Sequence, residues 1–389
     1  MGFKCVCKSW CSLTRGPSFL AFHRALCCNS TSRYTHLLLH FWDRTTRQDH
    51  LLSVKIIQDG SSPSPTTHCL TLPYEHHLYL THSSNGLVLL HPGNDLIYHK
   101  EPDHEYAMHI FNPCTRESIT LPNIIPSPTS YPWIDVVHLF GFCLLTNEYR
   151  VLQVQVQMSL GESARTITFK IFTLGTHSWR TIQVDLHDLP FDPFKWDIFQ
   201  KSLCVNGSLH WFHTDTSSYT FRIIVVFDLI EERLRAIDLP EPCTWGAEIF
   251  ELDGCLALVV AESFNIRSED GELLGQHDMI ELWILRDYQS QVWVKETVTI
   301  PIHLRGSRDH EHPPSCTIHP TLSCLPLCTI HSGVLMLQVS TANQLSIYVY
   351  DMKSKTFRRS EIMLPGWLCG DVQVELLTTY DDENIVPLR

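Results

Sequence analysis

The sequence predicts an all-β protein, a β-propeller of about six four-stranded blades preceded by two short α-helices. Three observations support this fold: a motif that recurs five times, turn pairs typical of tight hairpins, and helical spacing confined to the first thirty residues. Charged residues make up only 18% of the 389-residue chain, and its 22 prolines are spread along the whole length. This composition favours many short strands and uncharged turns over solvated helices.

Each repeat begins with a turn pair that is followed by an apolar strand. Asn-Gly and Asp-Gly accept the positive φ values of a tight hairpin turn, so these pairs predict the first hairpin of each blade. The five pairs are Asn85-Gly86, Thr146-Asn147, Asn206-Gly207, Asp253-Gly254 and Ser332-Gly333.

A second hairpin follows each time and is marked by one aromatic residue. The markers Phe111, Phe172, Phe227, Trp283 and Tyr350 are separated by 61, 55, 56 and 67 residues. After some markers, an Asp such as Asp228 or Asp351 is placed to cap the turn, and a large residue (Trp179, Leu234, Phe357) returns to the core. Two hairpins repeated radially form a propeller blade, and the ring protects the sheet edges.

The two ends of the predicted propeller supply a further blade. Residues 34–57 have the pattern of a strand, a polar turn and a strand, and residues 371–380 alternate as one more strand. We infer that these segments combine and close the ring as the sixth blade. Five or seven blades remain alternatives, whereas a pair of β-sandwiches would not produce a steady period.

The first thirty residues have a different pattern. Apolar residues there recur at helical spacing, and Gly16-Pro17 separates two short helices, the second of which Ser18 can cap. Helices of about a dozen residues are marginal alone, so these need a packing partner. The apolar faces comprise Phe3, Val6, Trp10 and Leu13 in the first helix and Phe19, Phe22 and Leu26 in the second.

Charge and cysteine usage exclude several classes of partner and location. A net charge of −13 disfavours nucleic acid and anionic membranes, and no apolar run is long enough for a transmembrane helix. The chain does not open with a signal peptide, and its 15 cysteines are scattered through predicted strands. We therefore expect Cys143, Cys204 and Cys255 to be buried free thiols in a protein of the cytoplasm or nucleus.

The sequence predicts no catalytic, cofactor-binding or metal-binding residue, and thus no enzyme. It contains no nucleophile elbow, phosphate loop or dinucleotide fingerprint. The cluster His310, His312, Cys316 and His319 matches no zinc template and indicates an inter-strand loop. His76, His77 and His82 are likewise expected to bind no metal, because they fit a strand next to a turn. Glu231 and Glu232 are expected on a solvated turn, and an enzyme with a site in the central channel is the remaining alternative. Five tryptophans are expected in blade cores: Trp42, Trp179, Trp211, Trp283 and Trp293.

Several of these motifs resemble those of a known family. Residues 3–23 resemble the end of an F-box as found in plant F-box proteins, and the remainder resembles their F-box-associated domain, a propeller related to kelch arrays. The resemblance implies a partial F-box at 1–28, a propeller at 34–380 and a tail at 381–389. The motifs that carry it include Asn85-Gly-Leu-Val-Leu-Leu90, Phe111-Asn-Pro-Cys-Thr-Arg116, Gly141-Phe142, Val205-Asn-Gly-Ser-Leu-His-Trp211 and Ser178-Trp-Arg180.

The resemblance implies a substrate-recognition subunit of a Skp–cullin–F-box ubiquitin ligase. In that role Phe3, Val6, Trp10 and Leu13 would face the Skp-family adaptor, while inter-blade loops such as 124–133, 186–196 and 264–278 would bind an unknown target protein. The Leu-Pro-rich segment and the helices that normally begin an F-box do not precede Phe3, so we expect either a truncated F-box or a gene model that begins at an internal methionine. The alternative is a non-catalytic interaction scaffold, or a competitor of full-length relatives, that lacks adaptor binding.

Overall fold

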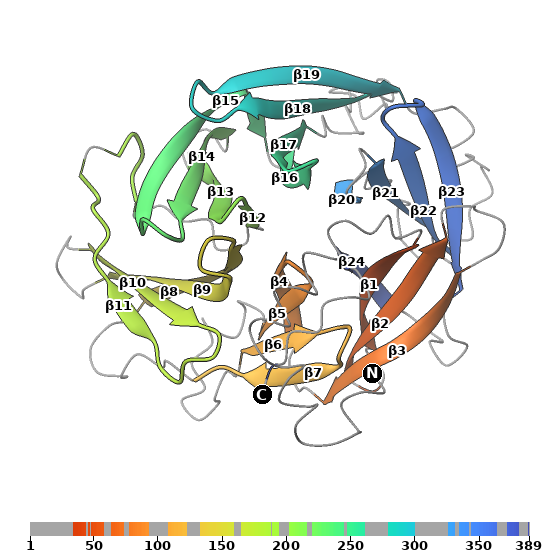
Figure 1. Cartoon of the computed structure of the whole chain (residues 1–389), viewed down its shortest axis with the longest axis horizontal. Coiled ribbons are helices and arrows are strands. Elements are labelled where there is room, and N and C mark those ends of the chain that lie inside the picture. Colours follow the sequence, from red (N-terminus) through yellow and green to blue (C-terminus); the bar gives the residue numbers. More distant parts are fainter. Residues whose placement is uncertain are drawn as a thin grey trace, which may run out of the picture.

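The computed structural model arranges 24 β-strands in a ring, and every regular element among the described residues is a strand (Figure 1). The predicted all-β propeller is thus confirmed. The two predicted helices fall in residues 1–28, which lie outside the described part of the chain. The described residues are 34–43, 46, 48–57, 64–73, 78–92, 108–122, 133–158, 165–187, 189–193, 202–215, 220–244, 247–260, 279–299, 326–330, 334–341, 344–363, 372–380 and 388.

Five units of four consecutive antiparallel strands follow one another around the ring. Blade 1 contains β4 (Leu78–Ser84), β5 (Leu87–Pro92), β6 (His109–Asn112) and β7 (Glu117–Thr120). Blade 2 contains β8 (Trp133–Cys143), β9 (Glu148–Met158), β10 (Arg165–Thr173) and β11 (Arg180–Ile182). Blade 3 contains β12 (Leu203–Val205), β13 (Ser208–Asp215), β14 (Thr220–Asp228) and β15 (Arg233–Thr244). Blade 4 contains β16 (Ala247–Leu252), β17 (Cys255–Val260), β18 (Met279–Asp287) and β19 (Val292–Thr299). Blade 5 contains β20 (Pro326–Ile330), β21 (Val334–Thr341), β22 (Gln344–Asp351) and β23 (Thr356–Met363).

Both ends of the propeller contribute to a closing blade. Its outer three strands are β1 (Tyr34–Asp43), β2 (Gln48–Ile57) and β3 (Ser64–Pro73), and its innermost strand is β24 (Val372–Tyr380). β1 pairs antiparallel with β24 from His36–Tyr380 to Asp43–Val372. The prediction that the two ends combine into one blade is therefore confirmed.

The number of hydrogen-bonded sheets differs from the number of four-stranded units. The described strands form five sheets, because β23 of blade 5 pairs in parallel with β3 of the closing blade and joins the two units into one eight-stranded sheet. This junction is short, since it pairs only Ile362 with Ser64 and Met363 with Pro65. The described strands therefore form five hydrogen-bonded sheets where six blades were expected, because two of the four-stranded units share one sheet.

The hydrophobic core lies between neighbouring blades. Alternate residues of a strand face opposite sides of its sheet, so each blade packs on the blade before it and the blade after it. The marker residues Phe111 and Phe227 are fully buried, as is Phe140, and burying such a ring stabilises the fold by roughly 1.5–3 kcal/mol. Of the predicted core tryptophans, Trp211 is buried, whereas Trp179, Trp283 and Trp293 are half-buried between blades. Trp42 belongs to β1, but its side chain lies outside the described part of the structure.

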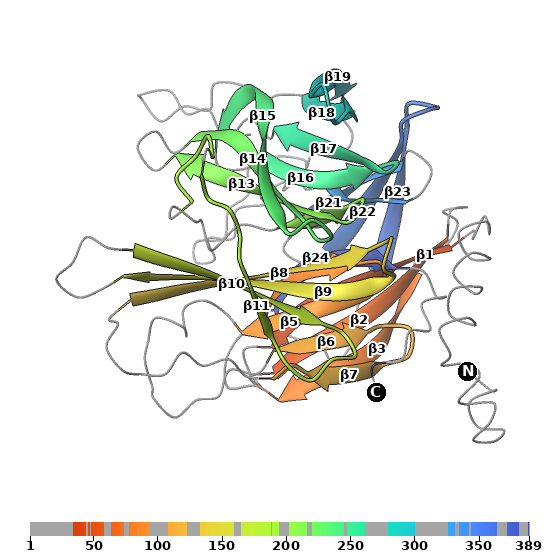
Figure 2. The same cartoon turned by 60° about the vertical axis from the view of Figure 1, so that its left-hand side comes forward.

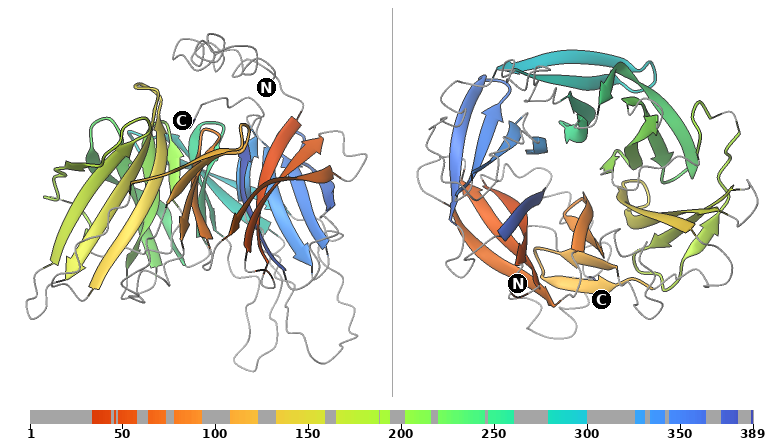
Figure 3. Two further views of the ribbon diagram at one scale, coloured as in Figure 1. Left: turned by 90° about the horizontal axis from the view of Figure 1, so that it is seen from below. Right: turned by 180° about the vertical axis from the view of Figure 1, so that it is seen from behind.

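Strand direction gives the ring two different faces, seen edge-on in the left panel of Figure 3 and obliquely in Figure 2. The first, called here the turn face, carries the hairpin turns inside each blade, including β4–β5, β8–β9, β14–β15 and β18–β19. The start of β1 and the end of β24 reach this face as well. Strands on the opposite face are joined by the longest connections, which are 93–108, 121–132, 183–202, 261–278 and 300–325.

Candidate interaction surfaces

The outer hairpins of four blades share one turn geometry. An Asn or Asp at the end of the third strand accepts hydrogen bonds from the backbone N–H groups two and three residues later, at 2.8–3.2 Å. The fifth residue of each turn has positive φ, between 51° and 58°. These N–H groups lower the pKa of Asp287 and Asp351. The expected caps at Asp228 and Asp351 are confirmed, with the same arrangement at Asn112 and Asp287.

The inner hairpins confirm three of the predicted turn pairs. Both residues have positive φ in Asn85-Gly86, Asn206-Gly207 and Asp253-Gly254, as a two-residue type I′ turn requires. The pair Thr146-Asn147 instead belongs to a four-residue turn in which Asn147 has a φ of 58°. Ser332-Gly333 lies outside the described residues.

A polar clamp joins blades 2 and 3 on the turn face. Arg180 donates two hydrogen bonds to the carboxylate of Glu232, one of them at 3.0 Å, and these raise the pKa of the guanidinium. Arg150 donates to the carbonyl oxygen of Leu229 and, at 2.8 Å, to Glu148. Burial raises the pKa of Glu148, but the hydrogen bonds from Arg150 and Thr146 and the positive charge of Arg150 together outweigh burial, and the net direction is downward. Glu232 therefore has a structural partner, whereas the sequence had indicated only a solvated turn residue.

A buried histidine joins blades 3 and 4. His210 on β13 is fully buried, and its Nε2 lies 2.8 Å from the hydroxyl of Tyr288 in the β18–β19 turn. Burial lowers the pKa of His210 to about 4 and raises that of Tyr288 to about 12. Both side chains are therefore neutral near pH 7, and the pair holds a turn of one blade in the neighbouring blade.

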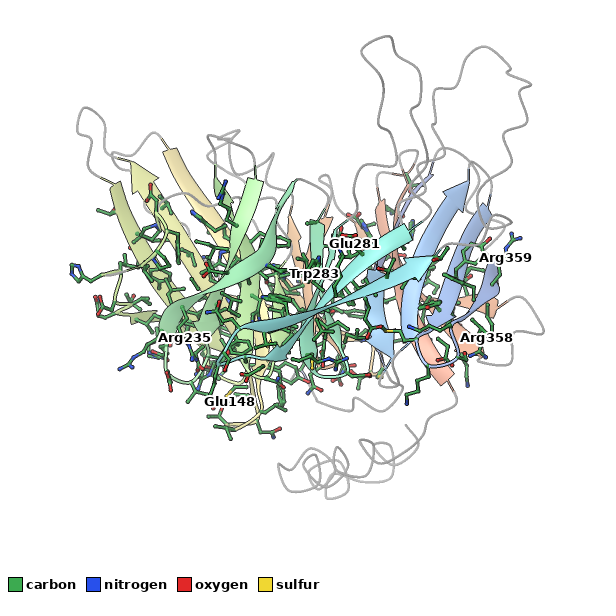
Figure 4. The ribbon with its side chains drawn as sticks, turned by 90° about the horizontal axis from the view of Figure 1, so that it is seen from above. Glu148, Arg235, Glu281, Trp283, Arg358 and Arg359 are labelled. Carbon is green, nitrogen blue, oxygen red and sulfur yellow. The ribbon has the colours of Figure 1, made fainter. Side chains whose placement is uncertain are left out.

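Exposed apolar side chains of the described residues gather at the turn face. Leu144 and Leu145 in the β8–β9 turn are 64% and 82% exposed, and Ile230 in the β14–β15 turn is 43% exposed. The remaining large exposed hydrophobic residues are Tyr288 in the β18–β19 turn and Val292 and Val294 at the start of β19. Figure 4 shows Glu148 and Arg235 near the same edge of the propeller, while Glu281 and Trp283 lie farther along blade 4. Leu144, Leu145 and Ile230, which lie in two neighbouring turns, therefore form a candidate interaction surface.

One long connection on the opposite face is partly built into the core. Val184, Leu186, Leu189 and Phe191, all between β11 and β12, pack against the cluster shared by blades 2 and 3. The ring centroid of Phe191 lies 5.0 Å from that of His213 at the end of β13. This part of the predicted binding loop 186–196 has a structural role. The predicted loop 124–133 is described only at Trp133, where β8 begins, and the predicted loop 264–278 lies outside the described residues.

The adaptor-side candidates Phe3, Val6, Trp10 and Leu13 lie outside the described residues, as do His76, His77 and the cluster His310, His312, Cys316 and His319. His82, in contrast, is buried and its Nδ1 lies 2.9 Å from the hydroxyl oxygen of Ser202. Within the described ranges, no group of three or more His, Cys, Asp or Glu side chains is placed to hold a metal ion. The part of the chain that is described also contains no candidate transmembrane helix.

The cysteines partly match their prediction. Five cysteines of the described residues are free thiols, and they include Cys143, Cys204 and Cys255, as expected. Cys143 is buried, whereas Cys204 and Cys255 are half-buried. Burial raises the pKa of Cys204 to about 11, which keeps this thiol protonated and unreactive near pH 7.

A ring of four-stranded units closed by both of its ends, with turns on one face and long connections on the other, defines a β-propeller of the repeat-built class. The family model "F-box associated beta propeller domain" matches residues 37–369. The chain therefore belongs to the F-box-associated β-propeller family, as the resemblance predicted.

Relatives from Arabidopsis thaliana carry F-box names. The F-box protein DOR is 27% identical over 301 residues, which cover 76% of this chain and 68% of DOR. The F-box/kelch-repeat protein At4g19930 is 22% identical over 397 residues, covering 94% of this chain and 82% of the relative. A third relative with an F-box name, At4g38870, is 27% identical over 312 residues, and the match covers 77% of this chain but only 64% of that protein.

Similarity to solved structures is far weaker. The AtxE2 isopeptidase aligns with a TM-score of 0.34 at 8% identity, over 86% of this chain and 50% of the isopeptidase. A likeness this low carries no argument about function.

Proposed function

We propose that this chain is the substrate-recognition subunit of a Skp–cullin–F-box ubiquitin ligase and acts by binding, without catalysis. The observation that carries the proposal is the family match over residues 37–369, together with relatives that are named F-box proteins. In this proposal the partial F-box at residues 1–28 contacts the Skp-family adaptor through its first helix, where Phe3, Val6, Trp10 and Leu13 supply the apolar side of that contact.

The target protein binds the opposite face of the propeller in this proposal. Long connections between strands can vary without disturbing the hydrogen-bonded blades, and such loops on a rigid scaffold commonly provide specificity. Five connections of twelve or more residues meet the strands at this face, whereas each fully described hairpin turn on the turn face is short. The free cysteines suit a reducing compartment, so we place this activity in the cytoplasm or nucleus.

Reconstitution with purified components tests the proposal. The chain would be mixed with a Skp-family adaptor and cullin, and ubiquitylation would be followed on candidate targets found by proximity labelling in plant cells. Two matched variants separate the roles of the two regions: one lacks residues 1–28, and one has residues 264–278 replaced by a Gly-Ser linker of equal length. We expect loss of adaptor binding in the first and loss of target binding in the second.

Two outcomes would overturn the proposal. Failure of both the 389-residue chain and an amino-terminally extended version to bind the adaptor would remove the ligase assignment. Target binding that persists without residues 1–28, with no ubiquitylation by any version, would instead favour the scaffold or competitor alternative.

A further inference from the structure

Two turns from neighbouring blades form one apolar patch on the turn face. Leu144 and Leu145 follow Cys143 directly, and Ile230 follows Leu229. Cys143 and Leu229 belong to the same buried cluster, so the two turns lie beside each other. Leu144, Leu145 and Ile230 are called here the turn patch.

Charged side chains border the turn patch. Arg150 bonds to the Leu229 carbonyl on one side of it, and Glu148 and Glu232 accept hydrogen bonds from Arg150 and Arg180. An exposed apolar centre with a polar border is the usual anatomy of a protein interface. The polar clamp also fixes the two turns relative to each other, so that the patch is formed before anything binds to it.

The amino-terminal segment enters the propeller on this same face. The start of β1 pairs with the end of β24, with His36 opposite Tyr380, and this pairing occupies the place that a hairpin turn takes in the other blades. The left panel of Figure 3 shows the described start of β1 at the edge opposite to that of the long connections. Residues 18–28 are separated from Tyr34 by five residues, which span up to roughly 20 Å when extended.

The chemistry of that segment complements the turn patch. Phe19, Phe22 and Leu26 are spaced as one apolar helical stripe, and such a short helix needs a packing partner. Residues 1–33 contain five Lys and Arg and no Asp or Glu, which leaves residues 34–389 with 24 Lys and Arg against 42 Asp and Glu. Opposite net charge favours association of the segment with the propeller.

We propose that residues 18–28 dock on the turn patch, with Phe19, Phe22 and Leu26 covering Leu144, Leu145 and Ile230. This contact fixes the amino-terminal segment on the turn face and leaves Phe3, Val6, Trp10 and Leu13 available to another protein. In a ligase, this contact would hold the adaptor in a fixed orientation relative to the target-binding face. That consequence rests on the proposed function. The contact itself does not require ligase activity and is testable without an adaptor.

Site-specific photo-crosslinking tests the contact directly. In the 389-residue protein, Leu145→p-benzoylphenylalanine should crosslink within one chain to the tryptic peptides 16–24 or 25–33. The matched control is Val294→p-benzoylphenylalanine, because Val294 is also exposed but lies on the outer strand β19. Crosslinks found only between isotopically distinct copies would show that a second copy covers the patch, and absence of any crosslink to residues 16–33 would likewise overturn the proposal.

Limited proteolysis provides an independent measurement. The double variant Leu144→Ser/Leu145→Ser removes apolar surface from exposed turn positions, and we expect trypsin cleavage at Arg15, Arg24 and Arg33 to become about tenfold faster. The control Val292→Ser/Val294→Ser should leave the cleavage rate unchanged. Equal rates in both variants and the parent protein would contradict docking. If the proteolysis rates do not change but the reconstituted ligase is active, the docking proposal is wrong and the proposed function stands.

Discussion

The two faces of the propeller are constrained in different ways. On the turn face, short hairpins reuse a small set of turn residues with positive φ, and side chains such as Arg150 and Tyr288 reach from one blade to the next. On the opposite face, the connections range from two residues at 245–246 to 26 residues at 300–325. Hairpin turns set strand register, so an inserted residue there would shift side chains to the wrong side of a sheet.

This contrast suggests a division of labour within the fold. The turn face holds the blades together, so its sequence has little freedom to change. Such a face is suited to binding the same protein partner every time. The opposite face can vary in length and composition at little cost in stability, because closure entropy grows slowly with loop length. The proposed adaptor side and target side follow this division.

Acid should weaken the turn face through His210. Burial lowers its pKa to about 4 from 6.5, so above pH 6.5 the ring is neutral in both folded and unfolded chains. As the pH falls from 6.5 to 4, the unfolded chain takes up a proton that the folded chain excludes, and the free energy of unfolding should fall by about 3 kcal/mol. Urea unfolding at pH 7 and pH 4 checks this.

The variant His210→Gln should lose much less stability over the same pH interval than the parent protein. The exposed His177→Gln is the matched control and should behave like the parent. Equal acid sensitivity of all three proteins would show that His210 does not contribute as its burial indicates.

Gly141 should tolerate no side chain, because blade 3 packs directly on β8. A Cβ at this position would lie 2.8 Å from Sγ of Cys204 and 2.9 Å from side-chain carbons of Leu209 and Leu229. We expect Gly141→Ala to lower the free energy of unfolding by about 1–3 kcal/mol. The double variant Gly141→Ala/Cys204→Ala should recover part of this loss, and strict additivity in the double-mutant cycle would argue against the contact.

The ion pair between Arg180 and Glu232 should have the smallest effect. The Arg180 side chain is 54% exposed, and exposed pairs contribute about 0.2–1 kcal/mol, less at high salt. Arg180→Ala should therefore reduce stability slightly in low salt and negligibly in 1 M NaCl. A salt-independent loss of more than about 2 kcal/mol would show that the polar clamp is a larger part of the blade 2–blade 3 contact than its exposure suggests.

The hairpins of the blades could be predicted because residues next to each other in the sequence specify their turns. Contacts between residues far apart in the sequence could not be predicted. The pairs Asn85-Gly86, Asn206-Gly207 and Asp253-Gly254 specify their turns through residues next to each other. The partners Arg180 and Glu232 are 52 positions apart, and His210 and Tyr288 are 78 apart. No periodic pattern marks such pairs in a single sequence.

The carboxyl-terminal end shows the same limit. The backbone N–H of Leu388 donates to Glu117 at 3.2 Å across 271 positions, and its side chain is buried between blades 1 and 2. The sequence indicated only a tail there. The sequence did not predict the turn patch, because Leu144 and Leu145 continue the apolar pattern of the preceding strand. In the structure β8 ends at Cys143, and both leucines are exposed in the β8–β9 turn.

A matched pair of insertions tests the contrast between the two faces most directly. The sequence Gly-Ser-Gly-Ser would be placed between Asp253 and Gly254 in one variant and between Glu269 and Asp270 in the other, and both would be unfolded in urea. The insertion after Glu269 should lower the free energy of unfolding by about 0.6 kcal/mol or less. The insertion after Asp253 should lower it by about 2 kcal/mol or more. Equal losses, or a larger loss from the insertion at Glu269, would contradict the account.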